Sequence, residues 1–173
     1  LAGEILGEIA GSGRGEIGVH LHPWVTPPFD ERVSRPNSYA GNLPAATEQA
    51  KLRHVRDVIC ERMHVVPTAY RAGRYGIGRN TLRILEQEGF RCDSSVRPLF
   101  DYSADGGPDF RWAEQHPGFV GPSGTILELP LTTVFTGRAG SSGRQIYGRL
   151  GAFPIARTLL SRLHLVNRIP LTP

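Results

Sequence analysis

The chain has 173 residues, which is enough for one domain with a sizeable core and too short for two full domains. Hydrophobic residues make up 39% and charged residues 21%, as in ordinary globular proteins, while 21 glycines and 14 prolines argue against a helical bundle. The net charge of +4 comes from arginines that are scattered and interleaved with acids, so we expect no nucleic-acid partner. No apolar run reaches the roughly 18 residues of a membrane helix, so we expect no membrane segment in this chain.

Patterns of apolar residues predict helices and strands that alternate along the chain. The strands are expected to be short, and turns rich in glycine and proline separate the elements. In chain order we expect a helix over 1–9, a strand over 16–22, a helix over 44–63, a strand over 65–71, a helix over 81–88, strands over 91–96 and 125–129, and a helical tail over 149–165 that is interrupted at Pro154. This alternation predicts an α/β fold with a parallel sheet.

The helix that begins at Pro44 has the clearest pattern. Proline is favoured at the first helical position because its missing N–H costs nothing there. Apolar residues recur at helical spacing and are expected to face the core, whereas the charged residues are expected to face water. The predicted buried residues are Leu52, Val55, Val58, Ile59 and Met63, and the predicted exposed ones are Glu48, Lys51, Arg53, Arg56 and Asp57.

Both ends of the chain look interrupted. The first predicted helix has no cap or strand before it, and the last residues, 171–173, give the tail no terminal cap. No signal peptide is visible, which favours a cytoplasmic location for a chain whose N-terminus is truncated. We therefore interpret residues 1–173 as a single partial domain of a longer protein.

Several common kinds of site lack their sequence motifs. Cys60 and Cys92 do not form a CxxC pair, which excludes a zinc ribbon or a redox motif, and both are expected to be small buried residues. No GxSxG, GxGxxG or Walker motif is present, which weakens serine-hydrolase, dinucleotide and nucleotide interpretations.

His20 and His22 give the strongest chemical signal. Residues two apart on a strand point to the same side, so both imidazoles can converge on one ion. They lie at the carboxyl end of the predicted strand, where α/β folds place their ligand sites. Two histidines suit zinc, cobalt, nickel or iron, and a competent site needs a third ligand as well. The alternative is a pair of histidines at the edge of a loop that bond to carbonyl groups or water.

Arg71 and Asp93 lie at the ends of two further predicted strands. An arginine followed by a glycine-rich turn can hold a carboxylate or a substrate oxygen, and Asp93 adds a carboxylate at the same predicted rim. The alternatives are a salt bridge that fixes a loop for Arg71 and an Asx-type turn for Asp93. Trp24, Tyr75 and Trp112 can offer aromatic platforms to sugar rings, and each is equally well explained as a core residue.

These segments, in this order, resemble the polysaccharide deacetylase (NodB-homology) superfamily, and most closely its branch found near exopolysaccharide and O-antigen synthesis genes. The stretch 16–24, EIGVHLHPW, is similar to the metal-histidine motif of that branch, and residues 38–44 are similar to the loop after it. The stretch 70–76, YRAGRYG, resembles the arginine motif, and the stretch 89–96, GFRCDSSV, resembles the next strand motif. Several motifs in register over residues 15–130 carry the resemblance.

The resemblance implies a distorted (β/α) barrel, of the deacetylase or glycoside hydrolase type, that holds a divalent metal ion between an aspartate and two histidines. In that family a water on the ion attacks the acetamide carbonyl, an aspartate takes its proton, and a late histidine protonates the leaving amine. The ion lowers the pKa of the water and stabilises the oxyanion. Carried over to this chain, the resemblance makes His20 the first metal histidine, lets Arg71 orient the base, and assigns Asp93 to the strand-end network.

The chain departs from the family pattern in three places. The second metal histidine of the family follows the first by four residues, where this chain has Trp24, and His22 is expected to take its place. The early Asp-Asp motif has no counterpart ahead of His20, and the late Leu-x-His motif has none either, because residues 127–129 lead to no histidine. We therefore expect either a fragment that lacks the catalytic base and acid or a remnant that has lost activity.

The sequence thus predicts a metal-dependent hydrolase that removes acetyl groups from N-acetylated sugars of a polysaccharide or its precursor, with zinc as the expected ion. The expected site consists of the metal ligands His20 and His22, the catalytic residues Arg71 and Asp93, and the substrate-binding residues Trp24 and Tyr75. The chief alternative is a catalytically inactive carbohydrate-binding or scaffold protein of the same fold. The partner in either case is an N-acetylated polysaccharide or oligosaccharide.

Overall fold

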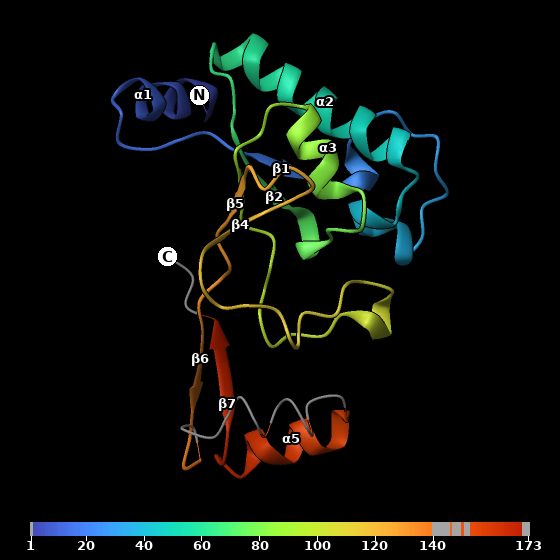
Figure 1. The fold of residues 1–173 in the computed structure, drawn as a ribbon, viewed down its shortest axis with the longest axis vertical. Coiled ribbons are helices and arrows are strands. Elements are labelled where there is room, and N and C mark those ends of the chain that lie inside the picture. Colours follow the sequence, from blue (N-terminus) through green and yellow to red (C-terminus); the bar gives the residue numbers. More distant parts are fainter. Residues whose placement is uncertain (1, 140–145, 147–149, 151–152, 171–173) are drawn as a thin grey trace.

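A five-stranded sheet forms the centre of the molecule (Figure 1). The computed structural model describes residues 2–139, 146, 150 and 153–170. The strands of the sheet are β1 (Val19–Leu21), β2 (Ala69–Ala72), β3 (Cys92–Asp93), β4 (Gly118–Val120) and β5 (Ile126–Glu128). They lie in the order β1-β2-β3-β5-β4, and all neighbours are parallel except β4 and β5, which are antiparallel. The four predicted strands of this sheet are therefore confirmed in shorter form.

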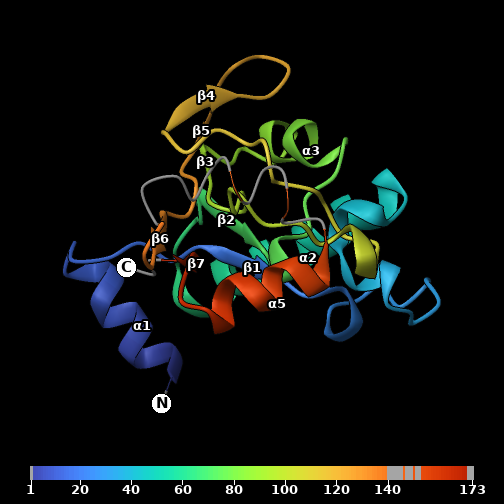
Figure 2. The same cartoon turned by 90° about the horizontal axis from the view of Figure 1, so that it is seen from below.

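Helices cover one side of this sheet. The helix α2 (Ala45–Met63) contacts β1, and α3 (Thr81–Gln87) contacts both α2 and β5 (Figure 1). Figure 2 shows the strands following one another from β4 to β1, with α3 and α2 on the same side of them. The helix α1 (Ala2–Gly11) packs against α2. Gly89 adopts a left-handed conformation with φ of 81° just after α3, as glycines at the ends of helices commonly do.

The two faces of the sheet differ in burial. Residues in register on parallel neighbours point to the same side, and successive residues along a strand point to opposite sides. Val19, Tyr70 and Asp93 are in register and buried under the helices. His20 and Arg71 are in register on the opposite face, where His20 is exposed. The buried core consists of Val19, Leu21, Ala40, Leu52, Tyr70, Ala72, Ile84, Leu85, Phe90 and Ile126.

A second, two-stranded sheet lies at the other end of the molecule (Figure 1). The strand β6 (Thr133–Thr136) pairs antiparallel with β7 (Asn167–Pro170), and α5 (Pro154–Arg162) lies between them in the chain. Leu150 is helical, Phe153 is not, and α5 begins at Pro154, so the described residues agree with the predicted interruption at this proline, which suits the first turn of a helix. Residues 149, 151 and 152 of that prediction lie outside the described residues.

The central sheet is open, with β1 and β4 at its edges in the part of the chain that the structure describes. The predicted α/β class with a mostly parallel sheet is confirmed, whereas the predicted barrel is not. Cys60 and Cys92 are both free and half-buried, and so are less enclosed than the sequence predicts. Among the described helices, none is long and apolar enough to cross a membrane.

Lys51 is fully buried, which corrects the prediction that it faces water. Its ammonium group donates hydrogen bonds to the carbonyl oxygens of Pro23, Thr26 and Pro28 at 3.1, 2.6 and 2.5 Å. It also lies 2.9 Å from the Glu31 carboxylate. The helical pattern of the sequence does not predict this burial, because the carbonyl oxygens that bind Lys51 come from the loop after β1, which folds back over α2. Lys51 therefore anchors that loop to the core.

Glu48, one turn before Lys51 on α2, is also buried and was predicted to be exposed. The Thr81 hydroxyl donates a hydrogen bond to its Oε1 at 2.5 Å, so the carboxyl group joins α2 to the start of α3. Burial raises the pKa of Glu48 to about 7, since the charged form loses its hydration there. The polar residues of α2 thus contribute to the core as well as to the surface.

Replacing Lys51 by alanine is expected to lower the free energy of unfolding by about 3 kcal/mol, because the change leaves Glu31 and three carbonyl oxygens without their buried partner. Urea unfolding of the two proteins measures this difference. Arg62→Ala, at an exposed position of the same helix, is the matched control and is expected to change stability by less than about 0.5 kcal/mol. Equal, small effects of the two substitutions would contradict an anchoring role for Lys51.

Candidate functional site

His20 and His22 lie together at the carboxyl end of β1, on the side of the sheet opposite the helices. The centroids of their rings are 4.7 Å apart, and the ring planes are inclined by 86°. The sequence prediction that the two imidazoles share one side of the strand is therefore met by the geometry. His20 is exposed and His22 is half-buried, so the pair lies at the rim of the open face.

One hydrogen bond fixes the ring of His20. Its Nδ1 lies 2.8 Å from the backbone carbonyl oxygen of Arg71, its register partner on β2. A carbonyl oxygen only accepts hydrogen bonds, so Nδ1 carries the proton and the lone pair of the neutral ring is on Nε2. Metal-bound histidines commonly have their second nitrogen held in this way. His20 is thus oriented with one nitrogen free to bind an ion.

His22 is packed tightly against the turn that follows β2. Its Nδ1 is buried and has no hydrogen-bond partner among the described residues. A Cβ atom at Gly73 would lie 2.5 Å from this nitrogen, so only glycine allows the approach. Burial lowers the pKa of His22, and the nearby His20 and Arg74 lower it further. A neutral ring with an unpartnered nitrogen is the form of histidine that binds a metal ion.

The separation of the two rings is compatible with a shared divalent ion. An ion about 2.1 Å from one nitrogen of each ring, at a tetrahedral angle, would hold the ring centres about 5 Å apart. The observed separation of 4.7 Å is close to that value. The described residues contain no group of three or more histidine, cysteine, aspartate and glutamate side chains that could hold a metal ion. The third ligand that the sequence analysis requires therefore stays a prediction.

Arg71 lies beside His20 on the same face of the sheet. Its guanidinium donates to the carbonyl oxygen of Ser94 at 3.1 Å and to the Ser94 hydroxyl at 2.9 Å. That hydroxyl donates in turn to the carbonyl oxygen of Leu129 at 2.8 Å. Arg71 and Ser94 therefore link the ends of β2, β3 and β5 through a chain of hydrogen bonds. Together with Gly18, His20 and Ser94 it lines a hollow of about 520 Å³ on the open face.

Asp93 lies at the end of β3, where it was predicted, but its side chain points to the helix-covered face, away from His20 and Arg71. The Ser95 hydroxyl donates to its Oδ1 at 2.5 Å and accepts from the backbone N–H of Ala72 at 2.8 Å. The strand period decides this placement, because Asp93 is in register with buried Tyr70. Asp93 and Arg71 were predicted to lie at the same rim, but their side chains lie on opposite faces of the sheet.

The Asp93 carboxylate faces a second buried carboxyl group, that of Glu128 on β5, which is its register partner. Burial raises the pKa of Glu128 to about 9, and the adjacent negative charge of Asp93 adds to the effect. Burial raises the pKa of Asp93 as well, against the hydrogen bonds that favour its charged form. Two such groups in contact hold one proton between them at neutral pH, since the ionisation of both would place two like charges in the core. The shared proton forms a side-chain hydrogen bond between Glu128 and Asp93.

The two predicted sugar-binding aromatic residues are in different surroundings. The Trp24 ring is 40% exposed and lies 4.8 Å, between centroids, from the ring of His22. Tyr75 stacks on Tyr102 at 6.0 Å, and the guanidinium of Arg97 lies over its ring. Trp24 is therefore the one that borders the histidine pair, whereas Tyr75, in the turn after β2, packs against Tyr102 in the loop after β3.

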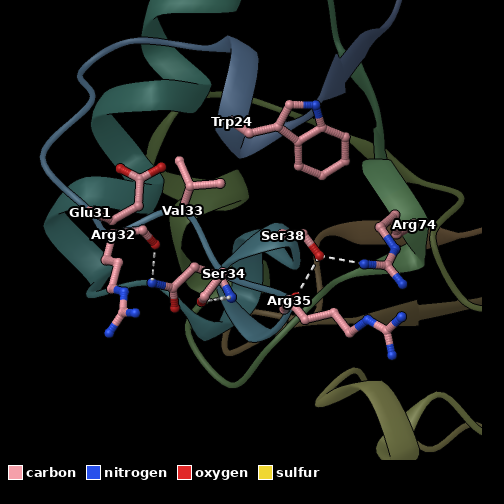
Figure 3. A pocket seen from close by; sticks show the side chains of 9 residues that line it. Trp24, Glu31, Arg32, Val33, Ser34, Arg35, Ser38 and Arg74 are labelled. Carbon is pink, nitrogen blue, oxygen red and sulfur yellow. Dashed lines mark hydrogen bonds between the residues drawn. The ribbon is translucent and has the colours of Figure 1, made fainter.

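A cavity of about 240 Å³ opens next to Trp24 (Figure 3). Its walls come from the loop between β1 and α2 and from the turn after β2, which are far apart in the sequence. The residues that line it are Trp24, Glu31, Arg32, Val33, Ser34, Arg35, Asn37, Ser38 and Arg74. Trp24, the loop 38–44 and the turn 70–76 each carried a signal in the sequence. Nothing in the local pattern shows that residues 31–38 meet residue 74, and so the cavity itself was not predicted.

Arg74 lies in the turn after β2 and has an unusual backbone conformation. Arg74 and Tyr75 have φ of 56° and 59°, a left-handed backbone that costs non-glycine residues roughly 1–3 kcal/mol each. The guanidinium of Arg74 lies 4.3 Å from the centre of the buried Tyr39 ring and donates a hydrogen bond to the Ser38 hydroxyl. These contacts stabilise the conformation and fix the direction of the side chain. Backbone strain of this kind is concentrated at functional sites.

Comparison with solved structures gives a likeness to one described as a "putative polysaccharide deacetylase" from Mycobacterium smegmatis. The TM-score is 0.51 at 25% sequence identity, over 75% of this chain and 36% of that one. The chain thus spans about a third of the length of that protein. No protein-family model matches the sequence, and no curated protein does. The mixed α/β fold and its mostly parallel sheet are therefore similar to those of a deacetylase-type hydrolase, which supports the superfamily resemblance.

The buried carboxyl pair predicts how stability depends on pH. Glu128 has a raised pKa in the folded state, so its contribution is complete below pH 4.5 and is lost as the pH rises towards 9. The substitution Glu128→Gln mimics the protonated form. The change in unfolding free energy that it causes is expected to be more favourable at pH 8 than at pH 5, by about 1 kcal/mol or more. Urea unfolding at the two pH values measures this.

The exposed Glu61→Gln is the control for this experiment and is expected to leave the pH dependence unchanged. Glu48 acts in the same direction as Glu128 because its pKa is also raised, so a slope that remains in the variant is expected. A Glu128→Gln protein that loses stability equally at both pH values would show that the pair does not share a proton.

Gly73→Ala is expected to lower the unfolding free energy by about 1–3 kcal/mol, since the added methyl group overlaps both His22 and the Leu21 carbonyl. Gly118→Ala on β4 is the matched control, because a Cβ there meets nothing within 4 Å. Thermal or urea unfolding compares the two variants. If both are equally stable, the turn after β2 does not press on His22 as described.

Proposed function

We propose that this chain is part of a metal-dependent hydrolase that removes acetyl groups from N-acetylated sugars of a polysaccharide or its precursor. The observation that carries the proposal is the pair His20 and His22, whose rings meet on the open face of a sheet that is similar to that of a deacetylase-type protein. The bond from His20 Nδ1 to the Arg71 carbonyl supports it further, because it leaves Nε2 free. The expected substrate is an N-acetylated polysaccharide or oligosaccharide.

In this proposal His20 and His22 hold a divalent ion, with zinc expected and cobalt, nickel or iron also suited to imidazole ligands. When bound, such an ion lowers the pKa of a water molecule and polarises the acetamide carbonyl. Arg71 borders the same hollow and can bind a substrate oxygen or orient a carboxylate there. Asp93 acts on the site only indirectly, since Ser95 links its carboxylate to the backbone of Ala72 at the end of β2. Trp24 offers an aromatic surface next to the ion.

The catalytic base and acid are expected outside this chain, as the departures from the family motifs indicate. Acetate release is therefore expected from a longer version of the protein that includes both flanking segments, and not from residues 1–173 alone. Metal binding, to which this chain contributes two ligands, can therefore be tested separately from the complete reaction.

The first test is the metal content of the purified protein, measured by elemental mass spectrometry. In the longer version we expect close to one zinc or cobalt ion per chain, with a clear loss in His20→Ala and in His22→Ala. His116→Ala, at an exposed histidine away from the pair, is the control and is expected to keep the ion. The metal-loaded longer version is then expected to release acetate from an N-acetylhexosamine polymer. Failure to release acetate from any such polymer would contradict the proposal.

A non-catalytic carbohydrate-binding protein of the same fold is the second candidate. The placement of Asp93 on the helix-covered face favours it, because the carboxylate expected near the site is engaged in the core instead. The cavity beside Trp24 also favours it, since such a cavity can hold a sugar without any chemistry. Glycan binding that persists in the presence of a chelator and in His20→Ala, without metal or acetate release in the longer version, would decide for this candidate.

A further inference from the structure

The charges of this protein are unevenly divided along the chain. All 16 aspartates and glutamates lie within residues 1–128, whereas residues 129–173 contain six arginines and no acidic residue. Arginines are therefore interleaved with acids only in the first part of the chain. Residues 129–173, here called the basic segment, include β6, α5 and β7. A segment of this charge is attracted to a surface or molecule that is negatively charged.

The helix α5 exposes large apolar side chains along one side. Ile155, Leu159 and Leu163, the residue directly after the helix, follow one another at intervals of four residues and so lie in one line, here called the apolar stripe. Their side chains are 77, 52 and 58% exposed. Figure 1 shows α5 at the end of the molecule away from α2 and α3. Among the helices and strands that the structure describes, none packs extensively against α5.

Hydrogen bonds and a buried side chain hold α5 in this orientation. The carbonyl oxygen of Leu160 accepts a hydrogen bond from the N–H of Leu165 at 3.0 Å, and that of His164 accepts one from the N–H of Arg138 at 2.9 Å. Val166, which follows, is fully buried. Leu160 lies on a different side of the helix from the stripe and is half-buried. The apolar stripe is therefore exposed because the helix is fixed with another side inward.

Positive charge lies beside the apolar stripe. Arg162 is exposed and follows Ile155 by seven residues, two turns of the helix, so both lie on the same side of α5. The basic segment contains no acidic residue that could pair with Arg162. A helix with exposed apolar residues and neighbouring arginines is suited to the boundary between the headgroups and the acyl chains of a bilayer. Anionic headgroups attract such arginines.

Two other kinds of partner fit these features less well. Nucleic acid would attract the arginines through its phosphates but would leave the apolar stripe in water. A second copy of the chain could offer α1, which exposes Ile5 and Ile9. The acidic residues of α1 are Glu4 and Glu8, which are too few to neutralise six arginines. A bilayer with anionic lipids accommodates both the stripe and the charge.

We propose that the basic segment binds the surface of a membrane that contains anionic lipids. The helix α5 lies along the surface, with the apolar stripe among the acyl chains and the arginines at the headgroup phosphates. Residues 1–128, in which acidic residues slightly outnumber basic ones, then face away from the surface. This inference goes beyond the proposed deacetylase function and does not depend on the histidine pair.

Co-sedimentation with lipid vesicles tests this, with the longer version of the protein that includes both flanking segments. One set of vesicles consists of phosphatidylcholine alone, and the other of equal parts of phosphatidylcholine and phosphatidylglycerol. The protein is expected to bind the anionic vesicles about tenfold more tightly than the neutral ones. The difference is expected to decrease as the salt concentration rises, because salt screens the charges.

Leu159→Gln is expected to reduce the affinity for the anionic vesicles by about tenfold, because a polar side chain does not insert among acyl chains. Arg162→Gln is expected to reduce it by about three- to fivefold, since one charge at the surface is lost. Both side chains are exposed, so the thermal unfolding of these variants is expected to match that of the unchanged protein. Val66→Gln and Arg62→Gln are the matched controls, at exposed positions outside the basic segment, and are expected to keep the affinity.

Equal binding to the two kinds of vesicle, or no binding to either, would overturn the proposal, as would an equal loss in Leu159→Gln and Val66→Gln. Binding to duplex DNA without binding to vesicles would assign the basic segment to nucleic acid instead. Self-association in sedimentation velocity that Leu159→Gln abolishes, again without vesicle binding, would assign the stripe to a second copy. His20→Ala is expected to keep vesicle binding, so the proposed function and this inference can fail separately.

Discussion

The hydrogen-bonded register between β1 and β2 is the constraint on which the rest of the structure depends. It places Val19 beside Tyr70 and His20 beside Arg71. Because side chains alternate along a strand, these two pairs point to opposite faces of the sheet. Helices α2 and α3 cover the first pair, which becomes part of the core, and leave the second pair open. A shift of one residue would put His20 under the helices and Val19 in water, so the burial of the core also fixes the polar open face.

The buried ammonium group of Lys51 connects the core to the loop that lines the cavity. It binds three carbonyl oxygens of the loop that follows β1, and it pairs with Glu31, which lines the cavity. The same loop carries Trp24, so the aromatic wall is tied to α2 through one side chain. Opposite it, the left-handed turn at Arg74 is held over Tyr39. The cavity is thus formed by two segments, each of which is fixed to the core separately.

Charged and polar residues on the two faces of the sheet have different surroundings. On the covered face, Asp93 and Glu128 share a proton and accept hydrogen bonds from Ser95 and Val96 inside the protein, so their contribution is to the core and to its pH dependence. On the open face, His20 and Arg71 are each held by a backbone carbonyl oxygen and keep donor or acceptor atoms free. Only the second arrangement leaves groups available to a ligand, and this is why the proposed chemistry is assigned to the open face.

The sequence alone determined the elements with a clear period: α2, α3 and the four strands whose apolar residues alternate or cluster, together with the common side of His20 and His22. These features depend on residues that are two to four positions apart, and so the local pattern is enough. Only the tertiary structure decided that Lys51 and Glu48 are buried, that Asp93 points away from Arg71, and that residues 31–38 meet Arg74. It likewise formed β6 and β7, whose partners are more than thirty residues apart. The reason is that burial and pairing depend on which segment folds over which face, and a local pattern does not contain that information.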